Sequence, residues 1–134
     1  MGILIDSSVL IGLERAQESC TSFIRGWEDE EVFVSVVSAS ELLHGVHRAA
    51  DSKIRARRLA FVEAVLSALP VLGIDLATAR SHAQLWSDLE KRGVMIGAHD
   101  AWLAATCLAR GLVLVTGNAR EFSRVPGLKV EQFA

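Results

Sequence analysis

The sequence predicts an α/β fold: a three-layer α/β/α sandwich around a small, mainly parallel twisted sheet. Short apolar runs, typical of strands that are buried on both faces, alternate with longer segments of helical periodicity. Strands that are separated by helices pair in parallel through right-handed crossovers, so helices cover both faces of the sheet. The chain has 134 residues, of which 51% are hydrophobic, and this suffices for a single domain over residues 1–134 with a full core.

The first half of the chain contains two strand-and-helix units. Residues 3–5 form an apolar run that ends at Asp6, and residues 9–14 then have helical composition. Residues 32–37 are mostly apolar and β-branched, which predicts a second buried strand. Helix-capping residue types follow directly and predict a helix over residues 38–50.

The second half continues the alternation. Pro70 is expected to end a helix over residues 52–69, because proline lacks the N–H that a helix interior needs. Asp75 is a capping residue type, and the pair Arg92-Gly93 is a stop signal, so a long helix is expected between them. After a loop at residues 93–98, the remaining elements predicted are an almost uncharged helix over 99–110, strands at 71–74 and 112–116, and an edge strand at 128–130.

Composition limits the classes of function. The 14 basic and 16 acidic residues give a net charge of −2, which argues against passive coating of nucleic acid but allows a nuclease whose metal ions neutralise its acids. With Cys20 and Cys107 as the only cysteines, a reducing cytoplasm is favoured. The N-terminus has no signal-peptide pattern, and polar residues interrupt the apolar stretch 93–116, so no membrane span is expected. The apolar excess predicts a surface that is buried against a partner.

Polar residues with oxygen ligands stand where predicted strands end and helices begin: Asp6, Glu41, Asp100 and Asn118. In a parallel sheet these positions meet at the edge formed by the carboxyl ends of the strands. Each has a structural explanation by itself, such as a helix cap for Asp6 or a capping box of Ser38 and Glu41. Carboxylates gathered in one cleft repel one another unless a cation lies between them, and an all-oxygen set suits Mg²⁺. The four histidines lack a cysteine framework, which argues against zinc.

Four segments together resemble the PIN-domain ribonucleases, and more narrowly the VapC toxins of bacterial toxin–antitoxin pairs. They are residues 3–10, 34–45, 96–106 and 114–122, and they follow one another in the family's order over essentially the whole chain. Four linked motifs are far more specific than any single acid. The resemblance implies a PIN-like fold and a metal-dependent endoribonuclease that hydrolyses RNA phosphodiester bonds and inhibits translation.

The resemblance also implies roles for particular residues. Asp6, Glu41 and Asp100 would be the three core acids of the catalytic site. Asp6 and Asp100 would be the direct ligands of Mg²⁺, for which Mn²⁺ can substitute, and Thr116 would position the site.

The chain departs from the family's pattern at two positions. Ser8 stands where the family often has Asn, and Asn118 occupies the family's fourth acidic position. Because Asn is neutral, we expect weaker binding of a second metal ion. Glu121, one helical turn beyond Asn118, either supplies the missing catalytic charge or caps the turn before Phe122.

Partners are implied by the resemblance as well: an RNA substrate, a cognate antitoxin that inserts a side chain or a helix into the acidic cleft, and a second copy of the chain. Trp86 is the candidate for the homodimer interface. Arg55 and Arg58 fall beside an apolar helical stripe, which indicates a partner carboxylate or an RNA phosphate. Arg120 and Arg124 are either further phosphate contacts or plain surface residues.

Other readings of the same acids are weaker. A haloacid-dehalogenase-like phosphatase wants a second Asp two residues after the first, where this chain has Ser8. A receiver-like signalling domain needs a phosphoacceptor Asp after a central strand, which residues 37–38 do not provide. A PIN-like module that is catalytically weak or inactive, and that only docks RNA or a protein, stays open as the alternative.

Overall fold

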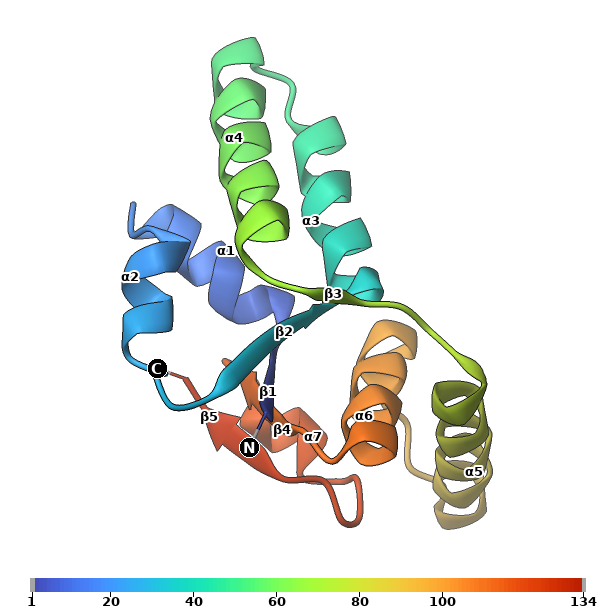
Figure 1. The fold of residues 1–134 in the computed structure, drawn as a ribbon. Coiled ribbons are helices and arrows are strands. Elements are labelled where there is room, and N and C mark those ends of the chain that lie inside the picture. Colours follow the sequence, from blue (N-terminus) through green and yellow to red (C-terminus); the bar gives the residue numbers. More distant parts are fainter. Residues whose placement is uncertain (1, 134) are drawn as a thin grey trace.

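A computed structural model of the chain describes residues 2–133 and contains one five-stranded sheet. The strand order is β3-β2-β1-β4-β5, and every pairing of neighbours is parallel (Figure 1). This confirms the predicted α/β class and places β1 at the centre of the sheet. The strands are β1 (Gly2–Ile5), β2 (Glu31–Ser35), β3 (Val71–Leu72), β4 (Val113–Thr116) and β5 (Val130–Gln132).

Helices flank the sheet on both faces, and the α3–α4 hairpin rises beyond it (Figure 1). Two short helices, α2 and α7, were not predicted, because six and four residues are too few to carry a periodic pattern. The helices are α1 (Ser7–Arg15), α2 (Cys20–Arg25), α3 (Val36–Arg48), α4 (Ser52–Ala68), α5 (Leu76–Arg92), α6 (Ala98–Arg110) and α7 (Ala119–Phe122).

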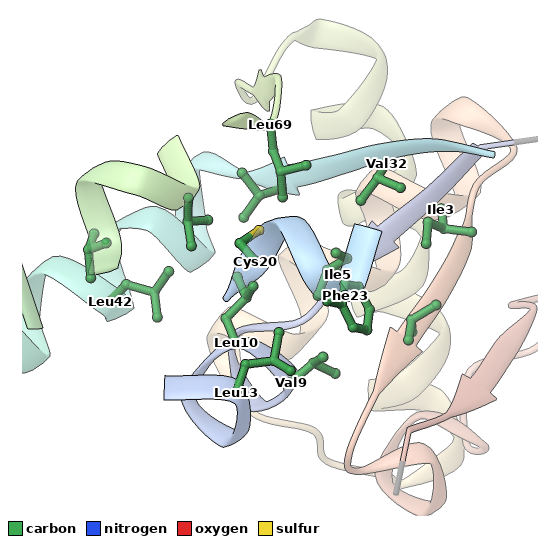
Figure 2. Close-up of a cluster of buried hydrophobic side chains, with 14 of the residues drawn as sticks. Ile3, Ile5, Val9, Leu10, Leu13, Cys20, Phe23, Val32, Leu42 and Leu69 are labelled. Carbon is green, nitrogen blue, oxygen red and sulfur yellow. The ribbon is translucent and has the colours of Figure 1, made fainter. Parts of the chain in front are cut away.

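Alternation along β1 divides the core between the two faces of the sheet. Ile3 and Ile5 belong to a cluster with side chains of α1, α2, α3 and α4 (Figure 2). Leu4 points to the opposite face and packs in a second cluster with side chains of α5, α6 and α7. All three are at most 2% exposed, so β1 is fixed in place from both sides and its carboxyl end is a rigid platform.

The start of α3 differs from the prediction. β2 ends at Ser35 and α3 begins at Val36, so the strand ends two residues earlier than expected. The Ser35 hydroxyl accepts a hydrogen bond from the Val37 N–H at 3.0 Å and caps the helix. The predicted capping box of Ser38 and Glu41 is therefore wrong, and Glu41 lies in the second turn of α3. This frees its carboxylate from a capping role.

The ends of the sheet also shift slightly from the expected ranges. β3 covers residues 71–72 of the predicted 71–74, and β5 covers residues 130–132 in place of 128–130. Both are outer strands, whose limits depend on pairing with one neighbour only. Within residues 2–133, no helix is both long enough and apolar enough to cross a membrane.

Candidate active site

The site is built at the carboxyl edge of the sheet, where β1 and β4 end side by side. Asp6 follows β1 directly, and its backbone N–H donates to the Val115 carbonyl of β4 at 2.9 Å. The pairing of Ile5 with Val115 thus brings Asp6 next to Thr116, which is 110 residues away in the sequence. Asp6 is 5% exposed and Thr116 is fully buried, so these two residues form the buried base of the site.

One oxygen of Asp6 is held by two hydroxyl groups. Thr116 Oγ1 donates to Asp6 Oδ2 at 2.7 Å, and Ser8 Oγ donates to the same oxygen at 2.9 Å. Each hydroxyl in turn accepts a backbone N–H, that of Asn118 for Thr116 and that of Gly117 for Ser8, both at 3.0 Å. Among the described residues, the Asp6 side chain accepts no backbone N–H from the start of α1, so a simple helix cap does not explain it.

Glu41 reaches the same edge from α3. The Ser7 hydroxyl donates to Glu41 Oε1 at 3.4 Å and lies equally far from Asp6 Oδ1, so it bridges the two carboxylates. On its other side, Glu41 Oε2 lies 3.6 Å from His99 Nδ1 at the start of α6. Glu41 is therefore fixed between the first turns of α1 and α6.

Asp100, in the first turn of α6, is the electrostatic centre of the cluster. Its burial raises its pKa to about 6 from 3.8, and the carboxylates of Asp6, Glu41 and Glu121 add to this rise, while His99 opposes it. Three separate parts of the chain thus place negative charge around one half-buried carboxyl group. A divalent cation bound between these carboxylates would offset their repulsion.

The two residues that depart from the family's pattern lie at the rim. Asn118 is exposed, and its backbone N–H, not its side chain, makes the bond to Thr116. Glu121 acts on Asp100, but its Oε2 also lies 3.8 Å from the Arg124 guanidinium. Arg124 also donates to the Met95 carbonyl at 2.9 Å, so its guanidinium makes contacts within the protein.

The donor set fits a hard divalent cation such as Mg²⁺ or Mn²⁺. Its carboxylates offer oxygen ligands, and the charges of Asp6, Glu41 and Glu121 add to the burial that raises the pKa of Asp100. Across residues 2–133, no three acidic, histidine or cysteine side chains enclose an ion-sized space as they stand. An open arrangement suits Mg²⁺, which keeps several of its waters and takes one or two carboxylates.

Comparisons with known proteins identify the family. Residues 3–128 match the PIN domain family. The chain is 35% identical to ribonuclease VapC1 of Rickettsia felis over 131 residues, which cover 97% of this chain and 95% of that protein. The chain belongs to the VapC ribonucleases of the PIN-domain family. This confirms the resemblance seen in the sequence, and with it a ribonuclease toxin of the toxin–antitoxin type.

Two further relatives come from Salmonella typhimurium. The tRNA(fMet)-specific endonuclease VapC is 35% identical over 100 residues, 75% of this chain and 74% of that protein. The crystal structure of DNA-bound VapBC contains a chain that superimposes with a TM-score of 0.89 at 27% identity, covering 100% of this chain and 99% of that one. VapC ribonucleases are generally metal-dependent, in agreement with the acidic edge described above.

A groove leads away from the acids of this VapC ribonuclease. It has a volume of about 470 Å³, lies between α1, α3 and α4, and opens beside Glu41 and His99. Its basic lining residues are Arg15, His44, Arg48, Arg58 and His99, its acids are Glu14 and Glu41, and its apolar ones include Ile11 and Phe61. Positive charge therefore prevails on its walls.

Two of the arginines singled out in the sequence serve the α3–α4 turn. Arg55 donates through Nε and Nη2 to the Ala49 carbonyl, at 3.0 and 2.6 Å. Arg58 donates to the Gly45 carbonyl at 3.1 Å and lies 3.7 Å from the Glu14 carboxylate, so the expected partner carboxylate exists. Both side chains satisfy carbonyl groups near the end of α3 that its own helix leaves unpaired.

Sequence reasoning missed one residue that shapes the edge, Gln132 in β5. Its Oε1 accepts the Ala119 N–H at 3.0 Å, and its Nε2 donates to the Gly117 carbonyl at 2.9 Å. The side chain thus clamps the loop that follows β4. No local pattern marks Gln132, because its role depends on the pairing of β5 with β4.

Proposed function

We propose that residues 1–134 form a single nuclease domain, a Mg²⁺-dependent endoribonuclease that acts as the toxin of a toxin–antitoxin pair and inhibits translation. The observation that carries this proposal is the set of carboxylates around Asp100, whose pKa is raised to about 6 by burial first and by the charges of Asp6, Glu41 and Glu121 in addition. Burial and repulsion together make a charged Asp100 costly in a site without a cation, so the arrangement favours metal binding. Mn²⁺ is expected to substitute for Mg²⁺, since both take oxygen ligands.

Asp6 and Asp100 are the proposed metal ligands. When bound, the cation would lower the pKa of a water molecule that it coordinates, and it would neutralise charge on the phosphoryl oxygens of the RNA. Glu41 orients the attacking water or accepts its proton, because its carboxylate is held between Ser7 and His99 at the mouth of the edge.

Asn118 and Glu121 complete the proposed catalytic set from the rim. Glu121 supplies negative charge next to Asp100, which supports the view that it replaces the acid that Asn118 lacks. The expected products carry 5′-phosphate and 3′-hydroxyl ends.

RNA is the proposed substrate, and transfer RNA is the first to test, since the Salmonella relative is named a tRNA(fMet)-specific endonuclease. The groove beside Glu41 is a suitable path for the RNA backbone. Arg15 and Arg48 are exposed residues on its walls, where a guanidinium can meet a phosphate.

We further propose a cognate antitoxin and a homodimer. The solved Salmonella relative is a VapBC complex. An antitoxin segment that covers the groove and the acids would exclude RNA from both, which accounts for neutralisation by simple competition. Trp86 on α5 is 59% exposed and supports an apolar contact with a second copy. Both cysteines are buried and free, which supports action in the reducing cytoplasm.

The test is cleavage of total cellular RNA by the purified, partner-free protein with Mg²⁺ or Mn²⁺. Discrete fragments that disappear with EDTA and with Asp6→Ala are the expected result, and mapping of the fragment ends identifies the target. A folded protein that binds RNA but cleaves none, with either metal, would replace this proposal by the inactive binding module.

A further inference from the structure

The two oxygens of the Asp6 carboxylate are in different situations. Oδ2 accepts hydrogen bonds from Ser8 and Thr116, at 2.9 and 2.7 Å. Among the residues that the structure describes, Oδ1 has only the longer contact with the Ser7 hydroxyl, at 3.4 Å. Most of the acceptor capacity of Oδ2 is therefore used inside the protein, while that of Oδ1 is available toward the acid cluster.

The hydrogen-bond directions around Ser8 are fixed by its neighbours. The Gly117 N–H can only donate, so Ser8 Oγ accepts that bond at 3.0 Å and directs its single hydrogen to Asp6 Oδ2. Thr116 is arranged in the same way by the Asn118 N–H. Two consecutive amides of the loop after β4 thus act through two hydroxyls on one carboxylate oxygen. The hydroxyl oxygens of Ser8 and Thr116 are themselves 3.5 Å apart.

We propose that Ser8 is a positioning residue of the active site, which together with Thr116 holds Oδ2 of Asp6 as an anchor and presents Oδ1 to the metal ion. This inference rests on the proposed metal site. Hydrogen bonds from neighbouring groups fix the orientation of a metal-binding carboxylate, and their loss typically weakens metal binding by about 10- to 100-fold.

The chemistry that position 8 requires is a group that accepts from Gly117 and donates to Asp6. A serine hydroxyl does both, and a carboxamide does both with separate atoms, whereas a methyl group does neither. Ser8→Asn is therefore expected to restore what Ser8→Ala removes. Serine and asparagine at position 8 are thus both expected to hold the Asp6 carboxylate in the same orientation.

The experiment measures Mn²⁺ affinity by electron paramagnetic resonance on the full chain without RNA, alongside thermal unfolding in EDTA. Ser8→Ala is expected to weaken Mn²⁺ binding by about 10-fold, and Ser8→Asn to keep most of the wild-type affinity. Ser123→Ala is the matched control, since the Ser123 hydroxyl donates to the Arg120 carbonyl at 2.6 Å, away from the acid cluster. Its Mn²⁺ affinity should equal that of the wild type.

The outcomes separate this inference from the proposed function. If Ser8→Ala melts at a lower temperature but binds Mn²⁺ as tightly as the wild type, Ser8 has only a structural role and the inference is wrong. Equal weakening by Ser8→Ala and Ser8→Asn, with both variants folded, also overturns it. If the wild type itself binds no Mn²⁺, the proposed metal site fails, and the Ser8 inference fails with it.

Discussion

Replacing Asp100 by Asn is expected to stabilise the metal-free protein while it abolishes RNA cleavage. The folded-state pKa of Asp100 is about 6, against 3.8 for an unperturbed group. Because the folded state binds this proton more tightly than the unfolded state does, stability falls as the pH rises through this interval. The full difference corresponds to about 3 kcal/mol at about pH 8. The Asn side chain keeps the shape of Asp100 and removes the repelled charge.

The assay is urea or thermal unfolding of both proteins with EDTA, at about pH 8 and about pH 5. The advantage of Asp100→Asn should be largest at the higher pH and should shrink to about half at the lower one, where the wild-type carboxyl is already protonated in the folded state. At the higher pH, 3 kcal/mol corresponds to a rise in Tm of about 10 °C for a domain of this size. Added Mg²⁺ should stabilise the wild type and leave the variant unchanged.

Asp29→Asn is the matched control, because Asp29 is an exposed carboxylate outside the cluster. Its unfolding should stay close to that of the wild type at both pH values. If Asp100→Asn proves equally stable or less stable than the wild type at the higher pH without metal, the raised pKa argued for Asp100 is wrong. Cleavage by this variant within a few-fold of the wild-type rate would remove Asp100 from the proposed ligand set.

Three further predictions concern other parts of the molecule. The Ser38 hydroxyl is buried without a hydrogen-bond partner among the described residues, so Ser38→Ala should raise the free energy of unfolding by about 1 kcal/mol in urea titrations; a loss of stability would reveal an unseen partner. Replacing both Arg15 and Arg48 by Ala should raise KM with little change in kcat, and it should reduce the slope of log K against log salt concentration for RNA binding by about 1.4. Arg57→Ala is the control, because Arg57 lies outside the groove. An equal effect of Arg57→Ala would argue against the groove as the RNA path. Trp86→Glu should shift sedimentation toward the monomer, and an unchanged dimer would place the interface elsewhere.

Local patterns were reliable where short-range physics decides the structure. The glycines at the ends of α5 and α6, Gly93 and Gly111, both have a φ of 66°, a left-handed conformation that glycine adopts without a steric penalty. Asp75 caps α5 through the Thr78 N–H, as its residue type predicts. The apolar run at residues 3–5 was likewise enough to predict the central strand.

Local sequence patterns gave the wrong helix start where two nearby residues were equally suitable as the helix cap. Ser35 and Ser38 are both capping residue types, and pairing of β2 with β1 through Val34 decided for the earlier one. For the same reason Glu41 was assigned to the wrong turn of α3 while its place among the acids was expected correctly.

By itself, the sequence determined the α/β class, the order of the elements and the residue types of the acidic edge, because alternation, capping and strand-end positions are encoded within a few residues. The tertiary structure alone decided how these groups interact. The pKa of Asp100 depends on its burial and on carboxylates from three distant segments, and the orientation of Asp6 depends on Thr116, 110 residues away. Such effects follow from distances across the folded chain, and those distances are set only when the crossovers close and both faces of the sheet are packed.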